Sequence, residues 1–175
     1  MKTQNQTMLS ENTLTSRPTD IIAGFPVRPG FFELNGATPL SNGVNFTAHT
    51  RHGTSCELLL FHSGEEEPFA VLPFPNACRI GDVYSMIVMG LDIEDLEYGY
   101  RIDGPYEPEK GHIFDKTKVL LDPYAKAVAG QREWGQQKIG SYHARVVRDS
   151  FDWEDMPQST RKISDLIIYE LHVRG

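Results

Sequence analysis

Short apolar runs alternate with turn residues between about residues 31 and 102. Five runs have the length and composition of strands, and Gly, Pro, Asn or charged residues separate them: 44–48, 56–61, 69–72, 83–89 and 98–102. Short strands that recur at a spacing of about ten residues are typical of an antiparallel sandwich. No convincing amphipathic helical pattern occurs in this part. The sequence therefore predicts an all-β fold, an antiparallel β-sandwich.

The pattern changes after Gly104, where prolines at 105, 108 and 123 stand too close together for long regular structure. We interpret this part as an extended segment that wraps the sandwich, with a helical turn near 122–127. The polar stretch from 130 to 163 is typical of a connector. The first residues of the chain are polar and rich in Thr and Asn, so we predict that they are disordered.

The final residues, "SDLIIYELHVRG", contain an apolar β-branched run at 167–169. Such a run is typical of a strand that is buried on both faces, as in a parallel sheet. An edge strand of the sandwich itself is the alternative that the residues leave open.

Composition narrows the function classes. The net charge of −7 argues against nucleic-acid binding, since the chain has no basic field. No stretch approaches the ~20 apolar residues of a membrane span, and the N-terminus lacks a secretory signal, so we expect a cytoplasmic protein without membrane contact. Cys56 and Cys78 are then predicted to be two buried thiols in place of a disulfide. Metal-ligand spacing is absent, and we predict neither metal nor cofactor.

Catalytic signals are weak. The chain has no Gly-x-Ser-x-Gly elbow and no phosphate-binding glycine motif. The acid pairs Glu94/Asp95 and Glu154/Asp155 fall in turn-like sequence, where we expect solvated loop acids. No catalytic residue is predicted.

Sugar binding is the more open alternative, because sugar rings stack their C–H faces on exposed aromatic side chains. The candidate substrate-binding residues are Tyr100, Tyr106, Trp134 and Trp153. Tyr98 and Tyr100 share one face of a strand, and a core position is the competing interpretation for such strand aromatics. The two tryptophans lie outside the strands and could instead pin the connector to a surface.

Four segments resemble glycogen-debranching enzymes and isoamylases: "YGYRIDGPYEPEKGHIFDKTKVLLDPYAKAVAG" at 98–130, "NGATPLSNGVNFTAHT" at 35–50, "FDWEDMP" at 151–157 and "DLIIYELHVRG" at 165–175. The resemblance extends over about residues 29–175. It implies an immunoglobulin-like sandwich of carbohydrate-binding module family 48, followed by a (β/α)₈ barrel of glycoside hydrolase family 13 that hydrolyses α-1,6 branch points of glycogen or starch. Tyr84-Ser85 departs from the Trp-His pair that relatives often carry, which weakens the expectation of a sugar-stacking surface there.

The resemblance also implies a domain organisation. We expect a disordered tail at 1–28, the sandwich at 29–104, the wrapping segment and connector at 105–163 as an irregular C-terminal extension, and the first strand of a truncated barrel at 164–175. That strand would include Tyr169, His172 and Arg174. The catalytic carboxylates of the family lie on later barrel strands, so this chain alone is expected to be inactive.

We therefore predict the non-catalytic N-terminal module of a glycogen-debranching enzyme, truncated before the catalytic residues. Its expected partners are the catalytic barrel and, weakly, an α-glucan. The alternatives are a free-standing α-glucan-binding or regulatory module, and a partner of a separately encoded barrel.

Overall fold

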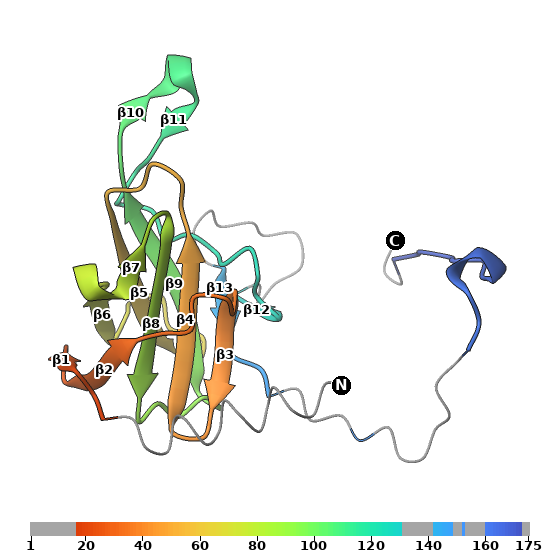
Figure 1. Ribbon diagram of the computed structural model, residues 1–175, viewed down its shortest axis with the longest axis horizontal. Coiled ribbons are helices and arrows are strands. Elements are labelled where there is room, and N and C mark those ends of the chain that lie inside the picture. The colour runs from red at the N-terminus through yellow and green to blue at the C-terminus, as the bar shows by residue number, and fades with distance from the viewer. Residues whose placement is uncertain (1–16, 131–141, 149–151, 153–159, 173–175) are drawn as a thin grey trace.

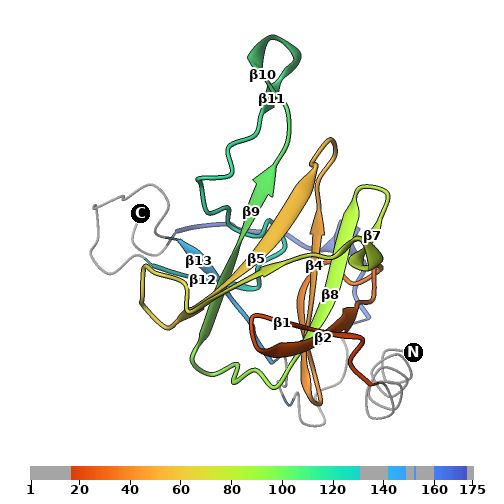
Figure 2. The ribbon, with the colours of Figure 1, turned by 90° about the vertical axis from the view of Figure 1, so that its left-hand side faces the viewer.

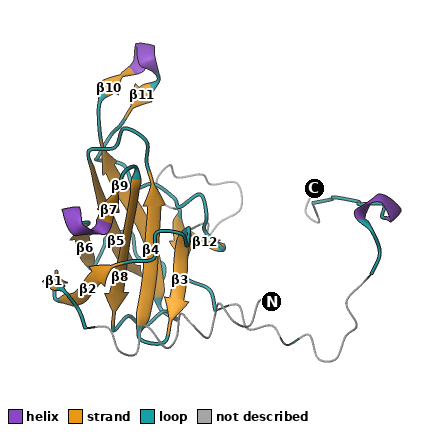
Figure 3. Ribbon diagram, in the orientation of Figure 1, coloured by secondary structure: helices purple, strands orange, loops and turns teal. Residues whose placement is uncertain are grey.

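The computed structural model describes residues 17–130, 142–148, 152 and 160–172. Strands make up most of the regular structure in these residues (Figure 3). They form two antiparallel sheets and a small hairpin. The first sheet has the order β1 (Asp20–Ile22), β2 (Phe25–Pro29), β8 (Val83–Met89), β4 (Gly43–His49) and β3 (Gly36–Leu40), and β7 (Arg79–Ile80) also pairs with β8. The second has the order β12 (Ala127–Ala129), β13 (His143–Arg145), β9 (Leu96–Asp103), β5 (Ser55–His62) and β6 (Ala70–Pro73).

The two sheets pack face to face as a sandwich (Figure 1). Strands β10 (Tyr106–Glu107) and β11 (His112–Ile113) form the hairpin, which projects beyond one end of the sandwich in both views (Figures 1 and 2). Among the described residues, helical backbone occurs only in 3₁₀ turns at Asn76–Cys78, Pro108–Lys110 and Ile163–Asp165. The predicted all-β sandwich is confirmed.

The core lies between the two sheets and follows the two-residue period of the strands. On β8, Tyr84, Met86 and Val88 all point into it. Tyr98 and Tyr100 enter the same core from β9 in the other sheet. Cys56 and Cys78 are buried and free, as the sequence predicted.

The opposite face of the first sheet is also covered, by the loop that follows β2. Asn45 Oδ1 accepts a hydrogen bond from the Phe31 N–H at 2.7 Å, and Asn45 Nδ2 donates to Thr47 Oγ1 at 3.0 Å. The hydroxyls of Thr47 and Ser85 lie 2.7 Å apart. A Cβ atom on Gly30 would lie 2.3 Å from Ser85 Oγ, so only glycine lets the loop approach this closely. We call Asn45, Thr47 and Ser85 the buried polar strip.

The five strands predicted from apolar runs correspond to β4, β5, β6, β8 and β9. The predicted start of the sandwich at residue 29 is wrong, because β1 and β2 already belong to the first sheet. Their turn places Ala23 and Gly24 at positive φ, 50° and 86°, as tight hairpin turns require. Residues 1–16 of the predicted tail lie outside the described residues.

The segment predicted as an irregular extension contributes two strands to the second sheet. β13 pairs with β9, and β12 pairs with β13. Leu120 adds a bridge to Tyr100, with backbone hydrogen bonds of 2.7 and 3.0 Å. In place of the predicted helical turn near 122–127, the Ala125 N–H donates to the Asp122 carbonyl at 3.0 Å and closes a single turn.

The described part of the predicted barrel strand, up to His172, forms no strand. The 3₁₀ turn Ile163–Asp165 is followed by irregular backbone over residues 166–172. A parallel strand needs neighbours on both sides for its hydrogen bonds, and no strand among the described residues pairs with this segment.

Candidate functional site

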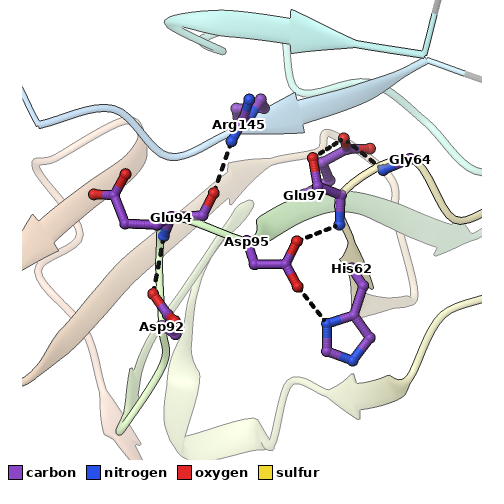
Figure 4. Close-up of polar contacts among 8 residues, drawn as sticks. His62, Gly64, Asp92, Glu94, Asp95, Glu97 and Arg145 are labelled. Atoms are coloured by element: carbon purple, nitrogen blue, oxygen red, sulfur yellow. Dashed lines mark hydrogen bonds and ion pairs between the residues drawn. The ribbon is translucent and has the colours of Figure 1, made fainter.

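Polar side chains gather where β5 ends and β9 begins (Figure 4). Antiparallel pairing brings these two ends together, since His62 is the register partner of Leu96. The loop after β5 supplies Ser63 and Gly64, and the turn before β9 supplies Asp95. We call the following residues the polar cluster: His62, Ser63, Gly64, Asp95, Glu97 and His143.

Two hydrogen bonds fix the Asp95 carboxylate at the surface of the polar cluster. Its Oδ2 lies 3.0 Å from His62 Nδ1, and its Oδ1 accepts from the Ser63 N–H at 3.1 Å. A carboxylate can only accept, so Nδ1 of His62 carries the proton and Nε2 is the ring atom left to meet a ligand. The side chains of His62 and Asp95 are 52% and 57% exposed. This pair is therefore oriented and accessible.

Glu97 occupies the buried half of the polar cluster. Its Oε1 accepts from the Ser63 hydroxyl at 3.2 Å and from the Gly64 N–H at 3.0 Å. Its Oε2 lies 3.1 Å from His143 Nδ1, and the two side chains are 3% and 4% exposed. The His143 ring stacks on Phe61 with centroids 3.8 Å apart. These contacts fasten β13 and the loop after β5 to β9, which is a structural role.

The turn before β9 also holds Glu94, whose N–H donates to Asp92 Oδ1 at 3.1 Å and whose carbonyl accepts from Arg145 at 2.9 Å. Glu94 and Asp95 are exposed, as predicted for loop acids. The other predicted acid pair, Glu154/Asp155, lies outside the described residues.

Three aromatic rings form a row beside the polar cluster. The His62 ring stacks on Phe69 with centroids 4.4 Å apart and planes 27° apart. Phe69 in turn meets Phe25 of β2 at 6.2 Å. Phe69 is 41% exposed. We call these three residues the aromatic row.

The structure separates the predicted sugar-binding tyrosines. Tyr100 is 2% exposed in the core, and its hydroxyl is buried without a partner among the described residues. Burial raises the pKa of Tyr100 well above its usual value. A sugar cannot reach this ring, so Tyr100 is removed from the candidates. Tyr106 is 71% exposed on the projecting hairpin, and Trp134 and Trp153 lie outside the described residues.

The residues assigned to the first barrel strand are accessible where they are described. Tyr169 is 85% exposed, and His172 is exposed as well. Arg174 lies outside the described residues. Among the described residues, no ion pair or ring contact joins Tyr169 or His172 to the polar cluster.

Sequence patterns alone did not predict the aromatic row. The apolar run at 69–72 predicts Phe69 as a strand residue, whereas β6 begins one residue later and Phe69 is exposed. Its position directly after "EEEP" was the available signal, because an aromatic residue next to a charged turn often lies at a strand end. His62 is the first residue of the turn predicted after the apolar run at 56–61, and nothing local indicates that it meets Asp95.

Other site types have no support in the part of the chain that the structure describes. It contains no group of three or more His, Cys, Asp or Glu side chains arranged to hold a metal. Within the same residues, no helix has the length and apolar character needed to cross a membrane.

Comparison with known proteins gives a family match. Residues 35–125 match the family described as carbohydrate-binding module 48 (isoamylase N-terminal domain). The chain is 34% identical to isoamylase SU1, chloroplastic, of Zea mays over 167 residues, which is 89% of this chain and 20% of that protein. It is 35% identical to the glycogen debranching enzyme of Salmonella typhi over 154 residues, 81% of this chain and 23% of that protein. The chain thus spans about a fifth of the length of these relatives.

Solved structures with a similar arrangement include a pullulanase of Paenibacillus barengoltzii in complex with maltohexaose and alpha-cyclodextrin. The match has a TM-score of 0.48 and 18% identity, and it covers 66% of this chain and 15% of that one.

Proposed function

Because the chain belongs to the carbohydrate-binding module 48 (isoamylase N-terminal domain) family, we propose that it serves as the non-catalytic N-terminal module of a glycogen-debranching enzyme. The module corresponds to the N-terminal region of isoamylases and glycogen debranching enzymes. In this proposal, α-1,6-glucosidase activity belongs to a catalytic barrel, and the sandwich supports that barrel and brings it to α-glucan. The cytoplasmic location stays a prediction.

The observation that carries the proposal is the exposed apolar run near residue 168. Ile167 is 98% exposed, and Ile168 and Tyr169 are 79% and 85% exposed. Full burial of one such side chain stabilises a protein by roughly 1.5–3 kcal/mol, so consecutive exposed side chains of this kind favour a covering partner. A catalytic barrel that takes up this run as a strand would satisfy its backbone groups as well.

A chimeric enzyme tests this proposal. The chain would replace the matching N-terminal region of the debranching enzyme that is 35% identical to it, and release of reducing sugar from glycogen would be measured. We expect the chimera to keep debranching activity that an enzyme lacking the region loses. A chimera that also carries Ile168→Asp and Tyr169→Asp should lose about tenfold or more, since two charges would enter an apolar contact.

Two results would contradict the proposal. A chimera no more active than the deleted enzyme would show that the sandwich does not support a barrel. Reducing sugar released from glycogen or pullulan by the purified chain alone would show that the module is itself catalytic.

A free-standing α-glucan-binding or regulatory module is the second candidate function. The exposed aromatic ring of Phe69 favours it, because exposed rings are what sugar faces stack on. Retardation of the isolated chain in a native gel that contains glycogen would support direct binding.

A further inference from the structure

We propose that the aromatic row of Phe25, Phe69 and His62, together with Asp95, is a contact surface for one α-glucan chain. This inference rests on the proposed function, because the family match is what identifies α-glucan as the ligand. It adds a location on the sandwich and a role for each side chain.

The aromatic row crosses from one sheet to the other. Phe25 belongs to β2 in the first sheet, whereas His62 ends β5 in the second and Phe69 precedes β6. The contacts between the rings, at 4.4 and 6.2 Å, hold Phe69 between its two neighbours while 41% of its surface stays exposed. A supported and partly exposed ring is suited to stack on the C–H face of a glucose unit at little cost in side-chain entropy.

Hydrogen-bonding groups lie directly beside the rings. Asp95 is held by the Ser63 N–H and by His62, so its carboxylate and the His62 Nε2 are fixed relative to Phe69. Sugar hydroxyls both donate and accept, so an exposed carboxylate and an oriented imidazole can each bind one. Few, well-placed polar groups beside an apolar surface are the usual composition of a small-ligand site.

The chain offers a matched comparison in Tyr106. Ser55 pairs with Asp103 at the hairpin end of β5, and His62 pairs with Leu96 at the other end. Tyr106, just after β9, therefore lies at the opposite end of the sandwich from the aromatic row. It is more exposed than Phe69, at 71%. If exposure of the ring alone decided sugar binding, Tyr106 would be the stronger contact. If binding also needs fixed rings and polar groups beside it, Phe69 would be the stronger contact.

Affinity electrophoresis of the full chain in native gels with increasing glycogen tests the proposal. We expect the wild type to be retarded and Phe69→Ala to bind about tenfold more weakly or worse. Asp95→Asn and His62→Gln should weaken binding by about threefold each, and Tyr106→Ala should bind as the wild type does. Maltohexaose added to the gel should restore the mobility of the wild type.

Phe69→Leu keeps apolar contact with Phe25 but removes the ring, so it covers the case in which Phe69→Ala does not fold. We expect Phe69→Leu to lose retardation with an unchanged thermal transition. Retardation that survives in Phe69→Leu and disappears in Tyr106→Ala would overturn the proposal and leave the proposed function intact. A wild type that glycogen never retards would also overturn it, and the chimera would then decide the proposed function separately.

Discussion

Asp122 joins the wrapping segment to the core through both of its carboxylate oxygens. The Tyr98 hydroxyl donates to Oδ2 at 2.7 Å, and the Tyr124 N–H donates to Oδ1 at 2.8 Å. Asp122 is buried, and Tyr98 is among the large side chains that are fully buried. The Asp-Pro-Tyr sequence that supports the family resemblance is thus explained by packing.

Replacing Asp122 by Ala should lower the free energy of unfolding by about 1–3 kcal/mol, because the Tyr98 hydroxyl and the Tyr124 N–H would lose their acceptor. Urea denaturation measures this difference. Asp122→Asn keeps one acceptor oxygen and should cost less. An alanine variant as stable as the wild type would show that water replaces the carboxylate.

Asp122 should also make the stability of the protein depend on pH. Burial raises the pKa of Asp122 above its usual value, although its two hydrogen bonds act in the opposite direction. The protonated form is therefore favoured in the folded state, and this stabilisation is present below the unfolded pKa of about 3.9 and is lost as the pH rises through the raised pKa. Over that window the wild type should lose stability relative to Asp122→Asn. Urea denaturation of the wild type and Asp122→Asn at several pH values measures this change. A difference in stability between the two proteins that stays constant with pH would contradict the prediction.

The sequence predicts which residues of a strand share a face, but not which of the two faces is buried against the other sheet. The two-residue period placed Tyr98 and Tyr100 on one face, but periodicity does not say which face meets the other sheet. In the structure, both rings are buried in the core between the sheets. The contact between His62 and Asp95 spans 33 residues, and it depends on the register of β5 with β9. No local pattern encodes that register.

At the scale of elements, strands with long apolar runs were predicted and short or proline-containing strands were not. β2 contains Pro26 and Pro29, which argue against a strand because proline cannot donate to a ladder. β13 is three residues long and carries two basic side chains. Its place in the sheet comes from tertiary contacts, above all the buried pair of Glu97 and His143.

His143→Ala should therefore release β13 from the sandwich. It leaves Glu97 Oε2 buried without the His143 ring, while Oε1 keeps its bonds to Ser63 and Gly64, and it removes the stack on Phe61, a loss of about 3 kcal/mol. We expect faster amide hydrogen exchange at 142–148 and unchanged protection in β4 and β8. Arg145→Ala is the matched control, because its exposed bond to the Glu94 carbonyl should contribute less than about 1 kcal/mol. Equal exchange in both variants would refute a role for the buried pair.

At the scale of the whole molecule, the reactivity of the two cysteines shows whether the core is closed. Cys56 lies on β5 and Cys78 in a 3₁₀ turn before β7, and both belong to the core between the sheets. Burial raises the pKa of Cys56 to about 12 and that of Cys78 to about 11. Neither thiol is then a reactive thiolate near neutral pH.

A thiol reagent such as DTNB at pH 8 should react with the native chain at least about 100-fold more slowly than with the chain in guanidinium chloride. Both thiols should become reactive in the same transition that removes the fluorescence or circular dichroism signal of the fold. Rapid labelling of one thiol in the native protein would mean that its part of the sandwich opens locally, contrary to a single cooperative core.

The buried polar strip has a consequence for how this protein can be produced. Asn45-Phe46-Thr47 fits the acceptor pattern for N-linked glycans in a secretory compartment. In the fold, however, the Asn45 side-chain amide is buried and bonded to Thr47, beneath the loop at Phe31. A glycan attached before folding would occupy the space of that loop, so glycosylation at Asn45 and the native sandwich exclude each other. Expression through a secretory route should yield a misfolded fraction that carries a glycan at Asn45, whereas bacterial cytoplasm adds no such modification.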